Sequence, residues 1–301
     1  MPYARAIVFS KDRPLQLDGL LRSLVVQVAD LSRLEVFVLW TVSSDEFARR
    51  YQDLMEDWPS VHFVRETSFY GQLMDLITDS SAPLIGFLVD DGLAVNPIHL
   101  EWAWRALELQ DQVVGFSLRV GPNLEKANQP IERQWWQMGP QDAHVVDPIE
   151  SVVPYTICYP WTKAQGAFNY RLEVSASLYR RSSLLDWLPK LGGIDHPNSL
   201  ENQMVFMPPE YVQHQPLLCM FERGAVLACP LNRVQSRAMR NEFSDMDTGL
   251  LSRVWDQGYR IDASVYNRYE YSSTHELLPL ILSHQESGRR LFLMPHVIKS
   301  S

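Results

Sequence analysis

Residues 82–97 read APLIGFLVDDGLAVNP, an apolar run that ends in two adjacent aspartates and a glycine. The run Leu84–Val89 is short, continuous and aliphatic, as is typical of a strand buried on both faces. Asp90 and Asp91 follow at once, although neighbouring carboxylates repel each other unless a positive charge offsets them. Because Asp-Gly is also a common turn pair, this stretch either forms a plain turn or holds a cation at a strand end.

The rest of the first half alternates between strand-like and helix-like segments. We expect strands over 5–10, 35–42, 61–65, 84–89 and 113–120, and helices over 14–27, 45–58, 69–78 and 97–110. This alternation predicts an α/β fold, a mostly parallel sheet with helices on both faces. Ligands of such sheets bind outside the carboxyl ends of the strands. Residues 10–13, 43–45 and 90–92 and the turn before Phe69 are expected to meet at that edge.

The second half is less regular. Residues 121–166 are rich in Trp, Pro and Gln, and we expect irregular structure laid over the sheet edge there. Further on we expect strands over 171–179 and 226–229, and helices over 182–191, 198–206 and 247–257. Asn198 or Ser199 would cap the helix over 198–206.

The composition is that of an ordinary globular protein, with 301 residues and a formal net charge of −9. This charge argues against a general nucleic-acid binder, which normally has a basic face. Cys158, Cys219 and Cys229 include no close pair, so we expect three buried thiols in a reducing compartment and no cysteine-based zinc site. The N-terminal apolar run is too short for a signal peptide, and no window has the length of a membrane span. A cytoplasmic protein without a transmembrane segment is therefore expected.

The order of these features resembles the GT-A fold of nucleotide-sugar glycosyltransferases, glycosyltransferase family 2 in particular, over residues 4–207. The resemblance rests on FSKDRP at residues 9–14, the DD pair at a strand end, and a later strand followed by an acidic helix. It implies that the first strand and its loop hold the nucleotide, through Ser10, Lys11 and Arg13. It also implies that Asp91 binds Mn²⁺ or Mg²⁺ and that Asp90 supports the ribose or the metal shell. From the residues alone, Lys11 and Arg13 fit a solvated turn equally well.

The second part of the resemblance is residues 173–204, EVSASLYRRSSLLDWLPKLGGIDHPNSLENQM. Glu201 falls where that family places the carboxylate that acts as catalytic base, although Glu-Asn stands here instead of the usual acidic pair. An inverting transferase needs one carboxylate to take the proton of the acceptor hydroxyl. Asp195 is an alternative base, and Glu201 is also suited to the positive end of a helix dipole.

Other residues have weaker assignments by the same resemblance. Asp45 would contact the base or ribose, or else cap a helix, and Gln72 would line the nucleotide pocket. His275 or His284 would either add to the metal shell or be a solvated or packed side chain. Trp135, Trp136 and Trp161 would either stack on a sugar or pack in the core. Arg233, Arg237 and Arg240 would form either a loop over the diphosphate or a surface charge cluster.

These expectations combine into a metal-dependent, inverting glycosyltransferase that moves a sugar from a nucleotide-sugar donor, with a UDP-sugar favoured, to a carbohydrate or other hydroxyl acceptor. One GT-A domain would span 1–301, with a nucleotide-binding half (1–120), an acceptor and catalytic half (121–240) and a C-terminal extension (241–301). One alternative is a non-catalytic protein of this fold that binds a nucleotide or carbohydrate. A nucleotidyltransferase is a third reading, but no Gly-rich loop follows the first strand. A dehydrogenase is disfavoured because the G-x-G-x-x-G fingerprint is absent.

Overall fold

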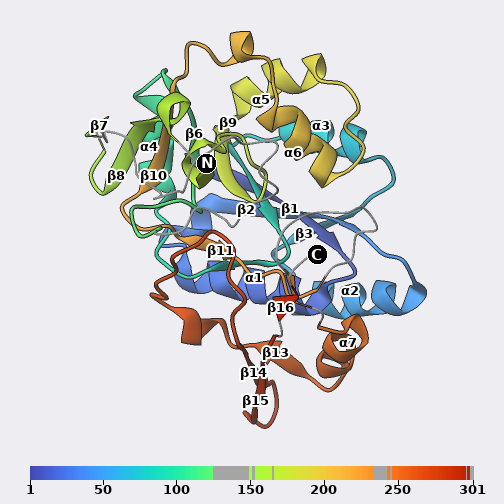
Figure 1. Ribbon diagram of the computed structural model, residues 1–301. Helices are drawn as coiled ribbons and strands as arrows, with labels where there is room; N and C mark the ends of the chain where they lie inside the picture. Colours follow the sequence, from blue (N-terminus) through green and yellow to red (C-terminus); the bar gives the residue numbers. More distant parts are fainter. Residues whose placement is uncertain are drawn as a thin grey trace.

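The computed structural model describes residues 1–124, 149–150, 153–164, 166–232, 243–244, 246–295 and 297–298. Its centre is a nine-stranded sheet with the order β3-β2-β1-β4-β9-β6-β10-β8-β7 (Figure 1). In that order the strands are His62–Arg65, Leu34–Thr41, Ala4–Lys11, Leu84–Val89, Ala176–Arg180, Val113–Ser117, Leu217–Phe221, Thr156–Pro160 and Ile149–Glu150.

The strand directions confirm the expected α/β class with a mostly parallel sheet. β1 pairs in parallel with β2 and with β4, and β6 pairs in parallel with β10. β9 is inserted antiparallel between β4 and β6, and β8 runs antiparallel to β10. Short polar turns end the first-half strands, which is why their bounds follow from the sequence to within a few residues.

Helices cover both faces of the sheet. They are α1 (Pro14–Gln27), α2 (Asp45–Asp57), α3 (Phe69–Thr78), α4 (Leu100–Glu108), α5 (Arg181–Trp187), α6 (Pro197–Val205) and α7 (Thr248–Asp256). In Figure 1, α1 and α2 lie below the sheet, and α3, α5 and α6 lie above it. Short 3₁₀ helices occur at Leu31–Arg33, Trp161–Lys163, Gly166–Asn169, Leu188–Lys190, Pro209–Tyr211 and Ala263–Tyr266.

Side-chain caps explain where some elements depart from the expected bounds. α4 begins at Leu100 and not at Pro97, because the Asp30 carboxylate accepts hydrogen bonds from the amides of Leu100 and Glu101. α6 is capped by the imidazole of His196, which accepts from the Ser199 amide, so the expected Asn198 or Ser199 cap was wrong. β9 starts at Ala176 and not at 171, because the Glu173 carboxylate turns the chain by accepting from the amides of Ser175 and Ala176.

The remaining strands form three small antiparallel sheets, two of which pack on α1 through β5 and β13. β13 (Tyr259–Ile261), β14 (Leu280–His284) and β15 (Arg290–Leu293) form one of them, beside α7. The other pairs are β5 (Gly92–Ala94) with β11 (Val226–Ala228), and β12 (Phe243–Ser244) with β16 (Val297–Ile298). The approach to α1 is close, because a Cβ at Gly19 would lie 2.7 Å from Cδ1 of Ile261.

The cysteines correct one expectation from the sequence. Cys158 on β8 lies opposite Cys219 on β10, and the two form a disulfide, whereas Cys229 is a buried free thiol. The pair is 61 residues apart in sequence, so only the strand register brings the sulfurs together. Three free thiols were therefore the wrong expectation. The cytoplasmic location stays a prediction, and it loses the support of a thiol-only chain.

Within the described part of the chain, none of the helices has the length and apolar character that a membrane crossing requires.

Gly115 allows β6 and β9 to pack closely, and we expect Gly115→Ala to lower the free energy of unfolding by about 1–3 kcal/mol. An added Cβ would lie 2.8 Å from the ring of Tyr179 and 3.3 Å from the carbonyl oxygen of Leu178. Chemical denaturation followed by circular dichroism measures the loss. The matched control is Gly192→Ala, where nothing lies within 4 Å. Equal denaturation midpoints for the two variants would contradict the prediction.

Candidate functional site

The strand register places Asp90 beside the end of β1. Phe9 of β1 is paired with Val89 of β4, and the Asp90 amide donates to the carbonyl of Phe9 at 3.2 Å. Ser10 is therefore the nearest neighbour of Asp90 across the two strands. Arg13 follows on the same loop, immediately before Pro14 opens α1.

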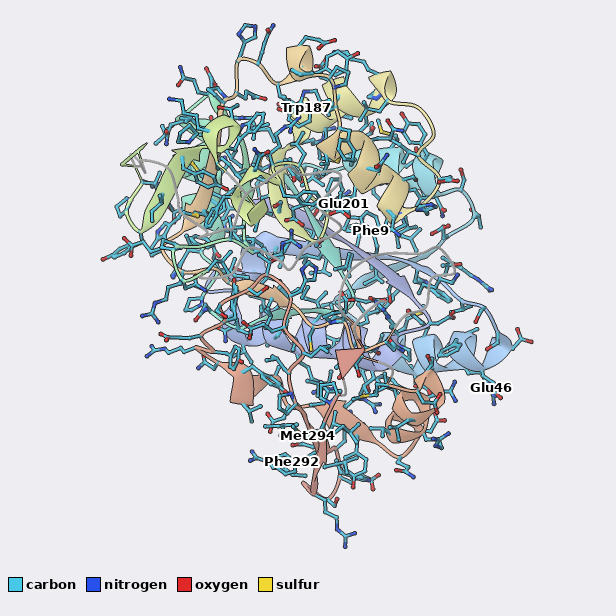
Figure 2. The ribbon with its side chains drawn as sticks, viewed as in Figure 1. Phe9, Glu46, Trp187, Glu201, Phe292 and Met294 are labelled. Atoms are coloured by element: carbon cyan, nitrogen blue, oxygen red, sulfur yellow. A yellow bond between two sulfur atoms is a disulfide. The ribbon has the colours of Figure 1, made fainter. Side chains whose placement is uncertain are left out.

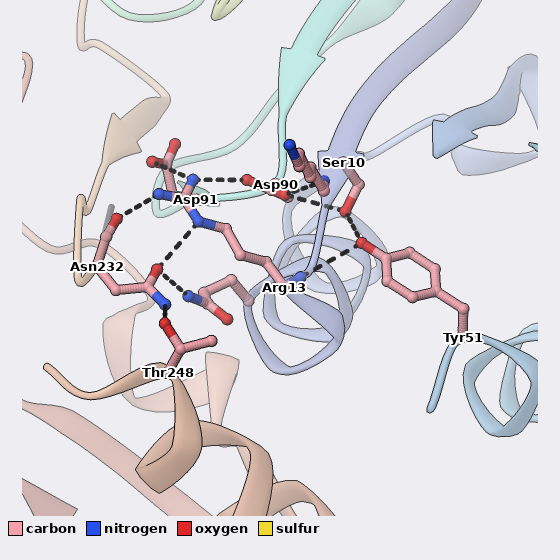
Figure 3. A network of polar contacts seen from close by, with 9 residues as sticks. Ser10, Arg13, Tyr51, Asp90, Asp91, Asn232 and Thr248 are labelled. Atoms are coloured by element: carbon pink, nitrogen blue, oxygen red, sulfur yellow. Dashed lines mark hydrogen bonds and ion pairs between the residues drawn. The ribbon is translucent and has the colours of Figure 1, made fainter. Parts of the chain in front are cut away.

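Arg13 joins the two aspartates of this edge. Its Nη1 atom lies 2.9 Å from Oδ1 of Asp90 and 3.0 Å from Oδ2 of Asp91 (Figure 3). Its Nε donates to Oδ1 of Asn232 at 3.0 Å, and its Nη2 donates to the Asn232 carbonyl. We call Arg13, Asp90, Asp91 and Asn232 the Arg13 cluster. The strand therefore ends in two carboxylates that share one guanidinium.

The second oxygen of Asp90 is also occupied. Oδ2 accepts from the Ser10 hydroxyl at 3.0 Å and from the Lys11 amide at 3.1 Å. The Ser10 hydroxyl is in turn hydrogen-bonded to the hydroxyl of Tyr51 on α2 (Figure 3). Each carboxylate oxygen of the buried Asp90 side chain thus has a partner from the β1–α1 segment.

Burial and charge act in opposite directions on this cluster. Burial raises the pKa of Asp90 to about 6; Arg13 acts to lower it and the neighbouring Asp91 to raise it. Burial alone would lower the pKa of Arg13, but Asp90 and Asp91 together raise it above its ordinary value. A largely buried guanidinium held by two carboxylates stays charged.

The two aspartates converge on one point, as the ligands of a single cation would. No group of three or more His, Cys, Asp or Glu side chains that could hold a metal exists within the described residues. Mg²⁺ often binds through only one or two carboxylates, and phosphates and water complete its shell. The pair Asp90 and Asp91 therefore fits such an ion only with Arg13 withdrawn from between the two carboxylates.

A second polar group, which we call the Glu201 cluster, consists of Arg119, Tyr170, Glu173 and Glu201. Arg119 Nη2 lies 3.9 Å from Oε2 of Glu173, and both side chains are buried. Glu173 also accepts the hydroxyl hydrogen bond of Ser177. Glu201 comes from α6, is half-buried, and lies on the side of that helix that faces the sheet (Figure 2). Tyr170 is hydrogen-bonded to Glu201.

The environment of Glu201 raises its pKa to about 7. Burial is the largest cause and the nearby Glu173 adds to it, while Arg119 and the hydrogen bond from Tyr170 oppose the shift. Arg119 has a raised pKa, because the effect of Glu173 and Glu201 outweighs the effect of burial. A carboxyl that titrates near neutral pH can both accept and return a proton under ordinary conditions.

Both clusters lie at the same edge of the sheet. Leu88, two residues before Asp90, is paired with Ala176, three residues after Glu173. Ser117, two residues before Arg119, is paired with Ser177. β4, β9 and β6 are neighbours in the sheet, so the Arg13 cluster and the Glu201 cluster stand side by side where ligands of open α/β sheets bind.

Two other sequence candidates have local roles in the structure. Asp45 is an exposed residue in the first turn of α2, and the N-cap is Ser44, which accepts from the Phe47 amide. Gln72 closes the turn before α3: its side chain accepts from the amides of Thr67 and Ser68 and donates to the carbonyl of Arg65. Neither joins the two clusters, and their nucleotide contacts stay predictions.

The alternative candidates also have structural partners. His284 accepts from the amides of Glu286 and Ser287 in the hairpin between β14 and β15. Trp161 is buried and donates to the carbonyl of Gln215 at 2.8 Å, consistent with core packing. Burial lowers the pKa of His275 to about 3, and Asp195 is exposed beside His196. Trp135, Trp136, Arg233, Arg237 and Arg240 lie outside the described residues.

Sequence reasoning missed several members of the site, because no local pattern marks them. Tyr51 has the helical spacing of a core residue, and Asn232 follows a short strand far along the chain. Arg119 fell within the strand expected over 113–120, and Tyr170 lies just before the strand expected over 171–179. The one sequence signal for Arg119 was its position: like Asp90, it is a charged residue that directly follows an apolar run, and such a charge can mark a site at a strand end.

No family model matches the chain. The chain is 26% identical over 256 residues to the bifunctional glycosyltransferase pgtA of Dictyostelium discoideum, a match that covers 77% of this chain and 32% of that protein. The chain thus spans about a third of the length of that curated relative.

One solved structure that the chain resembles is S. aureus TarS 1-349 in complex with UDP, with 13% sequence identity and a TM-score of 0.49. The match covers 75% of this chain and 59% of that chain. The mannosyltransferase PcManGT from Pyrobaculum calidifontis in complex with GDP-Man and Mn²⁺ has 14% identity, coverages of 73% and 56%, and a TM-score of 0.40. The resemblance expected from the sequence is confirmed to this extent: the chain is similar to a curated glycosyltransferase.

Proposed function

We propose that this protein is an enzyme that transfers a sugar from a nucleotide-sugar donor to an acceptor hydroxyl. The observation that carries the proposal is the placement of two acidic clusters, around Asp90 and around Glu201, beside the ends of neighbouring strands at one edge of the sheet. The similarity to a curated glycosyltransferase supports it. The chain spans a third of that relative, so its whole activity is not carried over.

In this proposal the diphosphate of the donor binds at the Arg13 cluster. Mn²⁺ or Mg²⁺, when bound there, would stabilise the charge that develops on the leaving diphosphate. Asp90 and Asp91 are the residues that would hold the ion. Ser10 and Tyr51 keep the Asp90 carboxylate oriented through their hydrogen bonds. A UDP-sugar remains the favoured donor, and a carbohydrate or other hydroxyl compound the acceptor.

Glu201 is the proposed catalytic base. It takes the proton of the acceptor hydroxyl as that oxygen attacks the anomeric carbon, and this single displacement inverts the configuration. Its pKa of about 7 leaves the carboxylate available at neutral pH. Tyr170 and Arg119 hold and partly neutralise the carboxylate, and so they position it without taking the proton themselves.

One observation favours the alternative of a non-catalytic nucleotide-binding protein. Asp90 and Asp91 are both already paired with Arg13, so the free protein offsets part of the charge of this edge without an added ion. Release of nucleotide from a donor sugar, with water as acceptor, separates the two functions. A non-catalytic protein would bind the donor and leave it intact.

The proposal predicts that one nucleoside diphosphate binds tightly with Mn²⁺ and at least tenfold more weakly without it. Calorimetry with UDP, GDP, CDP, dTDP and ADP, each with and without Mn²⁺, measures this. Asp91→Asn should abolish the metal-dependent part while keeping the fold, because asparagine still accepts from Arg13. The matched control is Asp79→Asn at the exposed end of α3. Unchanged Mn²⁺-dependent affinity in a folded Asp91→Asn variant would contradict the assignment.

A further inference from the structure

Arg13 occupies the point on which the two candidate metal-binding carboxylates converge. One nitrogen, Nη1, bridges Asp90 and Asp91, and the other two nitrogens are held by Asn232. Asn232 is itself fixed by Gln16, which donates to its Oδ1 at 2.9 Å, and by Thr248 at 3.2 Å (Figure 3). The guanidinium is therefore held in place by the turn after β4 and by Asn232, which is itself fixed from α1 and from α7.

The free space beside the two carboxylates is small. The cavity that Asp90 and Asp91 border has a volume of about 10 Å³, and Gln16, Cys229 and Leu231 are among its other lining residues. This volume admits about one water molecule. A divalent ion with its shell of water and phosphate oxygens is larger. An ion held by both carboxylates must therefore take the place of Nη1 of Arg13, which contacts Oδ1 of Asp90 and Oδ2 of Asp91.

The charges of the cluster decide which arrangement favours a diphosphate. Two carboxylates and one guanidinium carry a net charge of −1 when all are ionised, which repels a diphosphate. Addition of a divalent cation changes this sum to +1. The carboxylates would then be neutralised by the ion, and the positive charge of Arg13 would be free for the diphosphate.

We propose that Arg13 is an exchangeable internal counter-ion: it holds Asp90 and Asp91 in the free protein, releases them when a divalent cation arrives with a nucleoside diphosphate, and then pairs with the diphosphate. The inference rests on the proposed function. It explains why the buried Asp90 and its half-buried neighbour Asp91 are tolerated side by side without a metal. It also requires that cation and nucleotide bind with positive cooperativity, because neither alone offsets the loss of the Arg13 contacts.

Arg13→Gln tests the exchange, because its two expected effects have opposite signs. Without the competing guanidinium, Mn²⁺ alone should bind about tenfold more tightly than in the natural protein. With Mn²⁺ present, UDP or the nucleotide selected by calorimetry should bind about tenfold more weakly, because the diphosphate loses a cationic partner. Electron paramagnetic resonance of free Mn²⁺ measures the first effect, and calorimetry the second. Arg105→Gln, which removes the same charge from an exposed helical pair on α4, should change neither.

Mn²⁺ affinity that is unchanged or weaker in Arg13→Gln would overturn the exchange. A second result would also overturn it: the natural protein binds the nucleotide equally tightly with and without Mn²⁺, and Arg13→Gln no longer binds it. Arg13 would then be a permanent substitute for the ion. Arg13→Lys covers the case in which Arg13→Gln does not fold: a lysine keeps the charge but lacks the planar fork, so Mn²⁺ alone should still bind more tightly. If no nucleotide binds under any condition, the proposed function fails, while the comparison of Mn²⁺ affinities still decides whether Arg13 competes with the ion.

Discussion

Glu201→Gln is expected to lower kcat by about 10²–10⁴-fold, the usual contribution of a general base. Glutamine keeps the size and the hydrogen-bonding capacity of the side chain but cannot take the acceptor proton. KM for the donor should change little, because Glu201 belongs to a different cluster from Asp90 and Asp91. Steady-state release of nucleotide from the donor, with water or an added acceptor, gives both constants. The control is Glu210→Gln at an exposed position.

The pH profile gives a readout that a merely structural role would not change. Since the pKa of Glu201 is raised to about 7, kcat should fall as the pH drops below that value and the base becomes protonated. The hydrogen bond from Tyr170 acts to lower this pKa, so Tyr170→Phe should move the acidic limb to higher pH. A profile of the natural protein that is flat from pH 5 to 9, or a Glu201→Gln variant with full kcat, would exclude Glu201 as the base.

Arg119→Gln is expected to lower the free energy of unfolding by about 3–5 kcal/mol, because it leaves buried carboxylates without their cation. Arg119 is 3% exposed and Glu173 is also 3% exposed, so water cannot replace the lost pairing. Arg119 lowers the pKa of Glu201, and its removal should raise that pKa further. Urea denaturation at several pH values measures the loss.

The sign of the pH dependence follows from the direction of this shift. The folded protein holds a proton on Glu201 up to about pH 7, whereas the unfolded chain loses it near the ordinary value of 4.5. The stabilising contribution of this group is therefore fully present below pH 4.5 and is lost as the pH rises through 7. In Arg119→Gln the loss extends to higher pH, so the gap to the natural protein should widen between pH 5 and pH 9. A gap that is independent of pH, or as small as in Arg105→Gln, would contradict the argument.

Local sequence patterns were enough to predict the elements of the first half. The run Leu84–Val89 is a strand with those bounds, and Phe69–Thr78 is a helix with those bounds. Both patterns are strong because the periodicity of apolar residues is read over neighbouring positions, and polar turns mark the ends. The sequence also predicted that Ser10, Arg13, Asp90 and Asp91 meet, because parallel strands bring their carboxyl ends to one edge.

The strand order in the second half depended on contacts that no local pattern carries. β9 runs antiparallel between β4 and β6, and β10 and β8 extend the sheet beyond β6. Short apolar runs such as Leu217–Phe221 fit a buried strand or a piece of helix equally well, so neighbours in space decide the outcome. The same register pairs Cys158 with Cys219, against the expectation of free thiols.

By itself, the sequence determined the α/β class, the first four strands and the acidic strand end at Asp90 and Asp91, since these depend on residues close together along the chain. Only the tertiary structure decided what offsets the charge of that pair. Arg13 is 77 residues before Asp90, and Asn232 is 219 residues after Arg13, so their contacts form only when the sheet and the C-terminal segments pack together. The surroundings of Glu201 were decided in the same way, because Arg119, Tyr170 and Glu173 reach it from other segments, and burial there sets its pKa.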